Sequence, residues 1–185
     1  MPTDDRLRPT PGFTPEIGTL VSMLAYTRHT TLTAVQGLTP DQLDWSAGPR
    51  GNSIGALLAH MAAVEWAYGV ATFEDREPTA QEKTEWGPAL RLGAAARDRY
   101  TGWTLEQYEA LLAQVRQVSL RRLEPCQDSW LDREFTLIDG KTVNFRWAWF
   151  HVFEDELSHR GQILLIRNHL LPVPVVRAPT KNQEA

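Results

Sequence analysis

The sequence has 185 residues, of which 42% are hydrophobic and 23% charged, and its net charge is −4. This composition is typical of a soluble globular chain with one sizeable core, and mild acidity without a basic patch argues against a nucleic-acid partner. No uninterrupted apolar run reaches about 18 residues and residues 1–13 lack the apolar segment of a signal peptide, so we expect neither a membrane span nor export. A single cysteine, Cys126, allows no disulfide within the sequence, and a cytoplasmic location is expected.

Residues 1–13 are polar, include three prolines and are predicted to form a flexible arm. The run Thr14–Glu16 is a helix start, because it combines an N-cap hydroxyl, a proline at the first helical position and an acid in the first turn. This first helix is predicted to end at Gly37. After a connector, Ser53 is the predicted N-cap of a second helix that continues to about Phe73.

The second helix has one histidine, His60, on a face made of small residues. At helical spacing this face also carries Ser53, Ala56, Ala63, Val64, Ala67 and Ala71. Small side chains around an imidazole leave room for a cavity or for a close helix approach. A single histidine on an apolar face is more often a hydrogen-bonded core residue than a ligand, so both interpretations stay open at this point. Glu65 and Trp66 lie off the face, where a solvent or inter-helix position is expected.

A long connection follows, from Glu74 to Gly102, and it is rich in charge, proline and glycine. Residues 88–97 are expected to hold a short helix. A connection of this length is either functional or disordered, and in a helical bundle it would cover a site. A capping box over Thr104–Gln107 then predicts a third helix that ends near Leu123.

The period of the sequence changes before the last helix. Residues 134–138 and 141–143 flank Asp139-Gly140, which predicts a β-hairpin with a type I′ turn. Asn144 is the predicted N-cap of a last helix that continues to Leu171, where prolines stop it. Residues 172–185 are expected to form a tail.

One stripe of the last helix carries ionisable groups. His151, Asp155 and His159 are spaced i, i+4, i+8 among apolar residues of the same face. Burying such groups is costly unless each has a partner, so the stripe predicts either an Asp–His hydrogen-bonded pair or a metal site. Gln162 lies within one turn of His159, where it is a candidate for orienting a ligand. A second apolar stripe, with Phe150, indicates a central helix or contact with another subunit.

Four long helices, a long connection between the second and third, and a small hairpin predict an all-α fold, an antiparallel four-helix bundle with a crossover connection. The predicted bundle domain covers residues 14–171. Metal ligands from facing helices commonly converge in the cores of such bundles.

Two motifs carry a resemblance to a known family. Residues 53–60, SIGALLAH, followed by Glu65-Trp66, look like the second-helix motif of the DinB/YfiT-like family. Residues 151–163, HVFEDELSHRGQI, resemble the fourth-helix motif of that family, and the connector GLTPDQLDW also fits. The resemblance covers most of residues 15–171, and it is more specific for the fold than for the reaction.

The resemblance implies a homodimeric four-helix bundle with a divalent metal held by His60, Asp155 and His159. Most members have histidine at the position of Asp155, whereas the mycothiol-dependent maleylpyruvate isomerase branch has glutamate there. Aspartate is one methylene shorter, which puts the position of the metal in question and makes His151 an alternative ligand. Several members of the family are thiol transferases that use bacillithiol, mycothiol or glutathione.

Three protein ligands of this kind leave open positions on Zn²⁺ or Ni²⁺, which is typical of a catalytic site. A metal so held lowers the pKa of a bound water or binds a thiol as its thiolate. We therefore expect a metal-dependent enzyme that transfers a low-molecular-weight thiol of the bacillithiol or mycothiol type to a small electrophile. The reacting group would be the metal-bound water or thiolate, and no catalytic side chain is assigned.

Two alternatives remain. The first is a non-catalytic, dimeric binding or stress-response module with a structural metal. The second is a metal-dependent hydrolase with Glu154 or Glu156 as general base, which is disfavoured because both lie about a quarter turn from the metal stripe. Glu156 is instead expected to pair with Arg160 at i, i+4.

Overall fold

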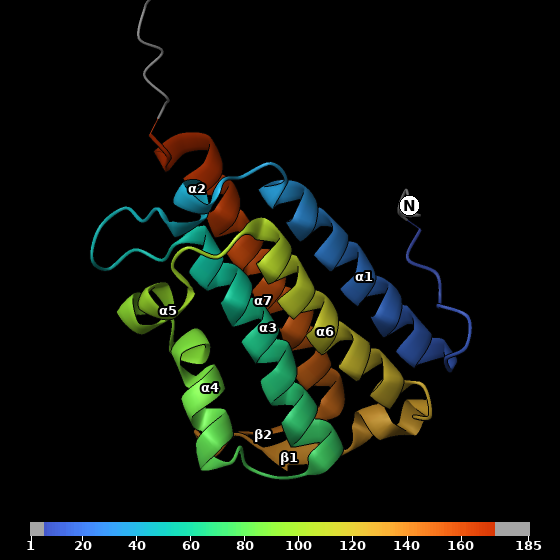
Figure 1. Cartoon of the computed structure of the whole chain (residues 1–185). Helices are drawn as coiled ribbons and strands as arrows, with labels where there is room; N and C mark the ends of the chain where they lie inside the picture. The colour runs from blue at the N-terminus through green and yellow to red at the C-terminus, as the bar shows by residue number, and fades with distance from the viewer. Residues whose placement is uncertain (1–5, 173–185) are drawn as a thin grey trace, which may run out of the picture.

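The computed structural model describes residues 6–172, and it is mostly helical with one small two-stranded antiparallel sheet (Figure 1). The α-helices are α1 (Pro15–Val35), α2 (Pro40–Asp44), α3 (Ile54–Gly69), α4 (Ala80–Arg91), α5 (Gly93–Tyr100), α6 (Leu105–Leu123) and α7 (Phe145–Leu165). The other elements are η1 (Val70–Glu74), η2 (Asp128–Asp132), β1 (Glu134–Thr136), β2 (Thr142–Asn144) and η3 (Ile166–Leu170). The four longest helices, α1, α3, α6 and α7, lie side by side, and the predicted hairpin leads directly into α7. The predicted tail lies outside the described residues beyond Pro172.

The helix starts predicted from capping residues are confirmed. Asn144 Oδ1 accepts the backbone N–H of the third helical residue of α7 at 2.9 Å, and Ser53 Oγ does the same for α3 at 3.1 Å. At α1 the cap comes from a distant residue. Thr14 makes no side-chain cap, and its hydroxyl donates to Asp128 Oδ1, which also accepts two backbone N–H groups of the first turn of α1. A carboxylate at a helix N-terminus is favourable because it faces the positive end of the helix dipole.

The connection between α3 and α6 contains two helices instead of the single short helix expected over residues 88–97. α4 begins earlier than predicted, at a capping box formed by Thr79 and Glu82, and it continues through Pro88. It ends because Leu92 and Gly93 have positive φ angles of 57° and 70°, which no right-handed helix accommodates. The connection is therefore an ordered pair of helices beside α3 (Figure 1).

The hairpin has the predicted strands but a different turn. Phe135 pairs with Val143 in an antiparallel register. A type I′ turn needs positive φ at both central residues, yet Gly140 has a φ of 84° and Asp139 is not among the residues with positive φ. The Gly140 N–H donates to the carbonyl of Leu137 at 2.8 Å, so the turn spans these four residues with only its last in the left-handed region. The type I′ prediction is therefore wrong.

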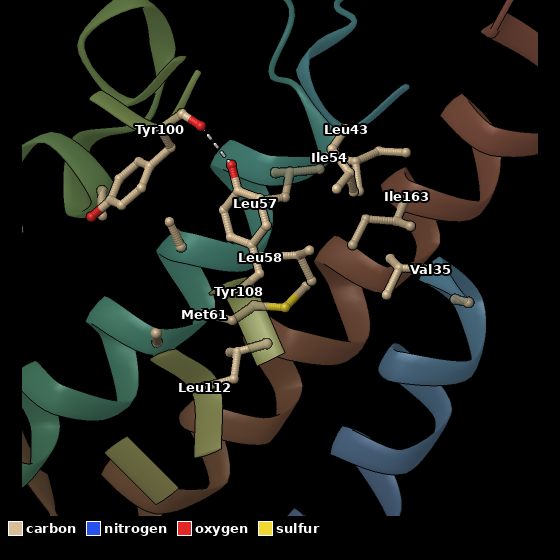
Figure 2. Packing of buried hydrophobic residues seen from close by; sticks show 14 of the residues in the cluster. Val35, Leu43, Ile54, Leu57, Leu58, Met61, Tyr100, Tyr108, Leu112 and Ile163 are labelled. Atoms are coloured by element: carbon tan, nitrogen blue, oxygen red, sulfur yellow. Dashed lines mark hydrogen bonds between the residues drawn. The ribbon is translucent and has the colours of Figure 1, made fainter. Parts of the chain in front are cut away.

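Two buried hydrophobic clusters form the core, one toward each end of the long helices. Figure 2 shows the cluster near α2, in which α3 and α6 approach closely. Tyr108 of α6 lies against Gly55 of α3, and its hydroxyl donates to the carbonyl of Tyr100 at 2.9 Å. A methyl group on Gly55 would lie only 2.2 Å from the Tyr108 oxygen, so this contact requires glycine.

The segment Ile54–Glu74, which combines α3 and η1, is long and apolar enough to cross a membrane by length and composition alone. We did not expect a membrane span from the sequence, because polar residues interrupt this segment. In the structure it is the helix against which α4, α6 and α7 pack, and 72% of its most apolar window is buried within the protein. A buried core helix accounts for this composition.

Between the two clusters lies a buried ring of four ionised side chains, one from each long helix, which we call the charged tetrad. It consists of Arg28 of α1, Glu65 of α3, Arg116 of α6 and Glu156 of α7. Around the ring the closest nitrogen–oxygen distances are 3.1, 2.7, 3.8 and 2.9 Å, and positive and negative groups alternate. Two guanidinium groups balance two carboxylates, so the buried charges are compensated.

The charged tetrad corrects one prediction and decides between the two alternatives of another. Glu65, which was expected at a solvent or an inter-helix position, is buried between helices, so the second alternative holds. Glu156 was expected to pair with Arg160, whereas it pairs with Arg28 and Arg160 donates to the hydroxyl of Thr30. The i, i+4 spacing gave the wrong partner because Glu156 faces the core.

Candidate metal centre

The structure brings together the three side chains predicted as metal ligands. His60 projects from α3 and is only 9% exposed, while Asp155 and His159 lie one turn apart on α7. Asp155 Oδ2 is 3.7 Å from His60 Nε2, and Asp155 Oδ1 is 3.4 Å from His159 Nε2. One ligand atom from each residue lies within 4.8 Å of the other two. This group is the one with metal-ligating potential among the described residues.

The hydrogen bonds on the far side of each imidazole decide which nitrogen is free. His60 Nδ1 lies 2.9 Å from the backbone carbonyl oxygen of Ala89, and His159 Nδ1 lies 3.2 Å from Gln162 Oε1. Both oxygens only accept hydrogen bonds, so both Nδ1 atoms carry a proton. A neutral imidazole in this tautomer has its lone pair on Nε2, the atom that faces Asp155.

The Ala89 carbonyl is available because α4 ends there. The last carbonyls of a helix have no partner in a following turn, and Ala89 O accepts one weak backbone bond, from Leu92 N at 3.3 Å. The break at Leu92 and Gly93 therefore leaves an acceptor beside His60. In this way the long connection positions a candidate ligand.

Asp155 completes a set of acceptors without a donor. Its Oδ2 atom is buried and has no hydrogen-bond partner among the described residues. With both imidazoles neutral, two Nε2 lone pairs and a carboxylate face one another, an arrangement that needs a cation between them, either a metal ion or a proton on one imidazole. The separations of 3.4 and 3.7 Å are close to the roughly 3.3 Å between ligand atoms around tetrahedral Zn²⁺. The residues therefore fit a divalent metal.

The electrostatics of the site show that the carboxylate and the imidazoles are strongly coupled. Burial opposes ionisation of Asp155, but the adjacent imidazoles of His159 and His60 outweigh it and hold the pKa of the carboxyl well below its usual range. Burial would likewise lower the pKa of His159, but Asp155 raises it above its ordinary value. Asp155 is therefore an anion at neutral pH, as a metal ligand must be.

A cavity of about 540 Å³ opens on this cluster. His60 and Asp155 lie in its wall, together with Tyr68 and His151. Eight of the other lining residues are apolar and come from α3, η1, α4, the hairpin and the loop after η1: Val64, Ala67, Ala71, Leu90, Phe135, Leu137, Ile138 and Pro78. Four more are polar or charged: Arg76, Glu77, Thr136 and Asp139. The small residues predicted around His60 are thus part of a cavity that a small molecule can enter.

Two further predicted residues have defined positions. Gln162 contacts His159 as described, which is the position expected of a residue that orients a ligand. His151 does not join the group of three, because its Nδ1 lies 2.9 Å from Glu154 Oε2. Tyr68, which the sequence reasoning missed, lies two turns after His60 on the same face of α3, and that spacing was a usable signal. Burial, together with the charge of Asp155, raises the pKa of Tyr68 to about 12, so it is a neutral hydrogen-bond donor.

The family is decided by comparison with known proteins. A family model described as mycothiol-S-transferase (MST) matches residues 19–171, which is most of the chain. The chain belongs to this family. The resemblance to DinB/YfiT-like proteins seen in the sequence is thereby confirmed. The MST match includes both motifs and all three clustered side chains, and a comparison with curated proteins gave no match.

Proposed function

We propose that this protein is a divalent-metal-dependent enzyme that transfers a low-molecular-weight thiol, of the mycothiol or bacillithiol type, to a small electrophile. The observation that carries the proposal is the convergence of two Nε2 lone pairs and an unpartnered carboxylate oxygen at one cavity. The MST family assignment supports the choice of a thiol as cosubstrate.

In this proposal His60, Asp155 and His159 hold the metal, with Zn²⁺ or Ni²⁺ favoured by the nitrogen and oxygen donors. Such a metal, when bound, favours the ionised form of a thiol or a water. The protein contributes the orientation of its ligands, because Ala89 O and Gln162 keep the imidazole protons on Nδ1. The apolar cavity wall reduces access of water and gives the electrophile a place to bind.

The architecture is part of the same proposal. We propose that residues 14–171 form an antiparallel four-helix bundle with a crossover connection. Two observations support this architecture: the four long helices lie side by side, and the MST model matches residues 19–171. We also propose a homodimer, since Phe150 and Leu164 on the outer face of α7 are 47% and 38% exposed.

The first test measures metal content and thiol transfer in the same preparations. Elemental analysis should find about one divalent metal per chain in the wild type and much less in His60→Ala and Asp155→Ala. Consumption of mycothiol, bacillithiol or glutathione with a panel of electrophiles should fall in parallel and be abolished by EDTA. His29→Ala, which removes an exposed histidine of α1, is the matched control and should keep both metal and activity.

If the protein bound metal but turned over no thiol, the proposed enzyme activity would be contradicted. A binding module with a structural metal would then be the better description. The hydrolase alternative has less support. Glu156 is engaged by two arginines in the charged tetrad, and Glu154 is hydrogen bonded to His151, so neither carboxylate is a free general base.

A further inference from the structure

His151 is held in a fixed orientation from three sides. Its Nδ1 lies 2.9 Å from Glu154 Oε2. Its ring stacks on Trp147, with centroids 5.1 Å apart and 7° between the planes. The edge of Tyr68 meets it at 5.6 Å and 79°. An imidazole packed in this way keeps its orientation without a metal bond.

The second imidazole nitrogen, Nε2, has no hydrogen-bond partner among the residues that the structure describes. The Glu154 carboxylate accepts only, so the proton of neutral His151 lies on Nδ1 and the lone pair lies on Nε2. His151 lines the same cavity as His60 and Asp155, and its side chain is 32% exposed. A histidine with a carboxylate on Nδ1 and a free Nε2 at a substrate cavity is the arrangement of a general base.

We propose that His151 is the proton-transfer residue of this site rather than a metal ligand, a step that rests on the proposed thiol transfer. The thiol S–H bond breaks and its proton moves to Nε2 of His151. The sulfur then forms a bond to carbon while the bond from carbon to an oxygen leaving group breaks with its electron pair. That oxygen takes the proton back from His151, which returns to its starting form.

The groups around His151 suit this role. Glu154 stabilises the positive charge that the ring acquires, and Asp155 lies one turn further along α7. Tyr68, a neutral donor from α3, and the Trp147 ring complete its surroundings. Among Glu154, Asp155, Tyr68 and Trp147, only Glu154 is hydrogen bonded to the imidazole. Substitution of Glu154 should therefore reduce activity less than substitution of His151, which removes the proton acceptor itself.

The experiment compares metal-loaded wild type with His151→Gln, using His29→Gln as the matched control. Styrene oxide is the electrophile, and its ring oxygen is the group that needs a proton. Two thiols are used, the weakly acidic 2-mercaptoethanol and the acidic trifluoroethanethiol. At a mildly alkaline pH, where the second thiol is largely ionised, the variant should lose about 100-fold or more in kcat/KM with the first thiol. With the second thiol it should lose much less, because only the return of the proton to the oxygen is then missing. Added imidazole should restore part of the activity of His151→Gly.

A second readout needs no turnover. Thiol binding is followed in weakly buffered solution with a pH indicator and without electrophile. Wild type should retain the thiol proton on His151 and release almost none, whereas His151→Gln should release close to one per site. Metal content by elemental analysis should be equal in both.

Each outcome decides between the hypotheses. Loss of metal in His151→Gln, equal activity loss with both thiols, or equal proton release from both proteins would overturn the assignment of His151. Proton retention in the wild type together with no transfer to any electrophile would instead reject the proposed reaction while the assignment stands. The two failures are therefore distinguishable.

Discussion

At the scale of single residues, the proposed metal centre depends on where two protons are held. His60 and His159 both carry theirs on Nδ1, because an oxygen acceptor lies next to each of those atoms. The acceptor for His159 is a side chain, Gln162, and it can therefore be removed without touching a ligand. This makes its contribution measurable.

Gln162→Leu should weaken metal binding about 10- to 100-fold, because loss of the acceptor lets the His159 ring change tautomer and orientation. The measurement is competition with a chelator of known affinity. Gln117→Leu, at an exposed position on α6, is the control and should bind metal as the wild type does. If Gln162→Leu bound metal equally well, the contact with His159 would be incidental packing.

At the scale of elements, contacts at glycine residues determine how closely two helices approach. Gly55 lets α3 approach Tyr108 of α6, and the ideal position of a Cβ there lies 2.2 Å from the hydroxyl oxygen and 2.7 Å from the ring. Gly161, on α7, has open space at the same position. Substitution by alanine is therefore expected to have opposite effects on stability at Gly55 and at Gly161.

Gly55→Ala should lower the free energy of unfolding by about 1–3 kcal/mol, because Tyr108 must move or the helices must separate. Gly161→Ala should raise it by about 0.5–1 kcal/mol, because alanine is the better helix former and meets no atom. Urea denaturation of both variants measures the difference. A destabilised Gly161→Ala would show that this position of α7 is not open, and an unchanged Gly55→Ala would show that α3 and α6 can adjust at little cost.

Local signals in the sequence predicted the elements well where the cause was local. The caps Ser53 and Asn144 are followed by the helices they predict, because a cap bonds only to its own first turn. The end of α4 was missed because its cause, a left-handed φ at Leu92, is not signalled by an apolar residue. The cap of α1 was assigned to Thr14 because nothing in sequence links it to Asp128, more than one hundred residues away.

The same limit applies to the candidate site. The i, i+4 spacing of Asp155 and His159 is visible in one helix, and the motif resemblance added His60. The Ala89 carbonyl was beyond prediction, because every residue has a carbonyl and only the fold selects one. The charged tetrad had a partial signal, since Arg28 interrupts the apolar face of α1 between Leu24 and Thr31, but the partners of Arg28 come from three other helices.

At the scale of the whole molecule, the charged tetrad ties all four long helices together. Burial alone would raise the pKa of Glu65, but Arg116 and Arg28 outweigh burial and hold it below its ordinary value. A carboxyl with a lowered folded-state pKa stabilises the fold above its unfolded pKa of about 4.3, and that stabilisation disappears as the pH falls through the lower folded-state pKa. The tetrad therefore predicts a specific dependence of stability on pH.

Glu65→Gln should cost about 3–5 kcal/mol of unfolding free energy at pH 7, because two buried guanidinium groups are left with one carboxylate. As the pH is lowered below about 4.3, the wild type should lose more stability than the variant, so the difference between them should shrink. Urea unfolding between pH 7 and pH 3 measures this, with Glu85→Gln, at an exposed position on α4, as the control. A constant difference across this range would mean that Glu65 stays ionised or that its charge does not stabilise the fold.

The carbonyl of Ala89 has a consequence for how this centre tolerates mutation. Because the group that fixes the proton of His60 belongs to the main chain, exchanging the side chain at position 89 cannot delete it. A substitution at position 89 alone would therefore not report on this interaction, although a candidate ligand depends on it. The sensitive positions are instead Leu92 and Gly93, since the bend they impose is what turns that oxygen toward the imidazole rather than into another helical turn.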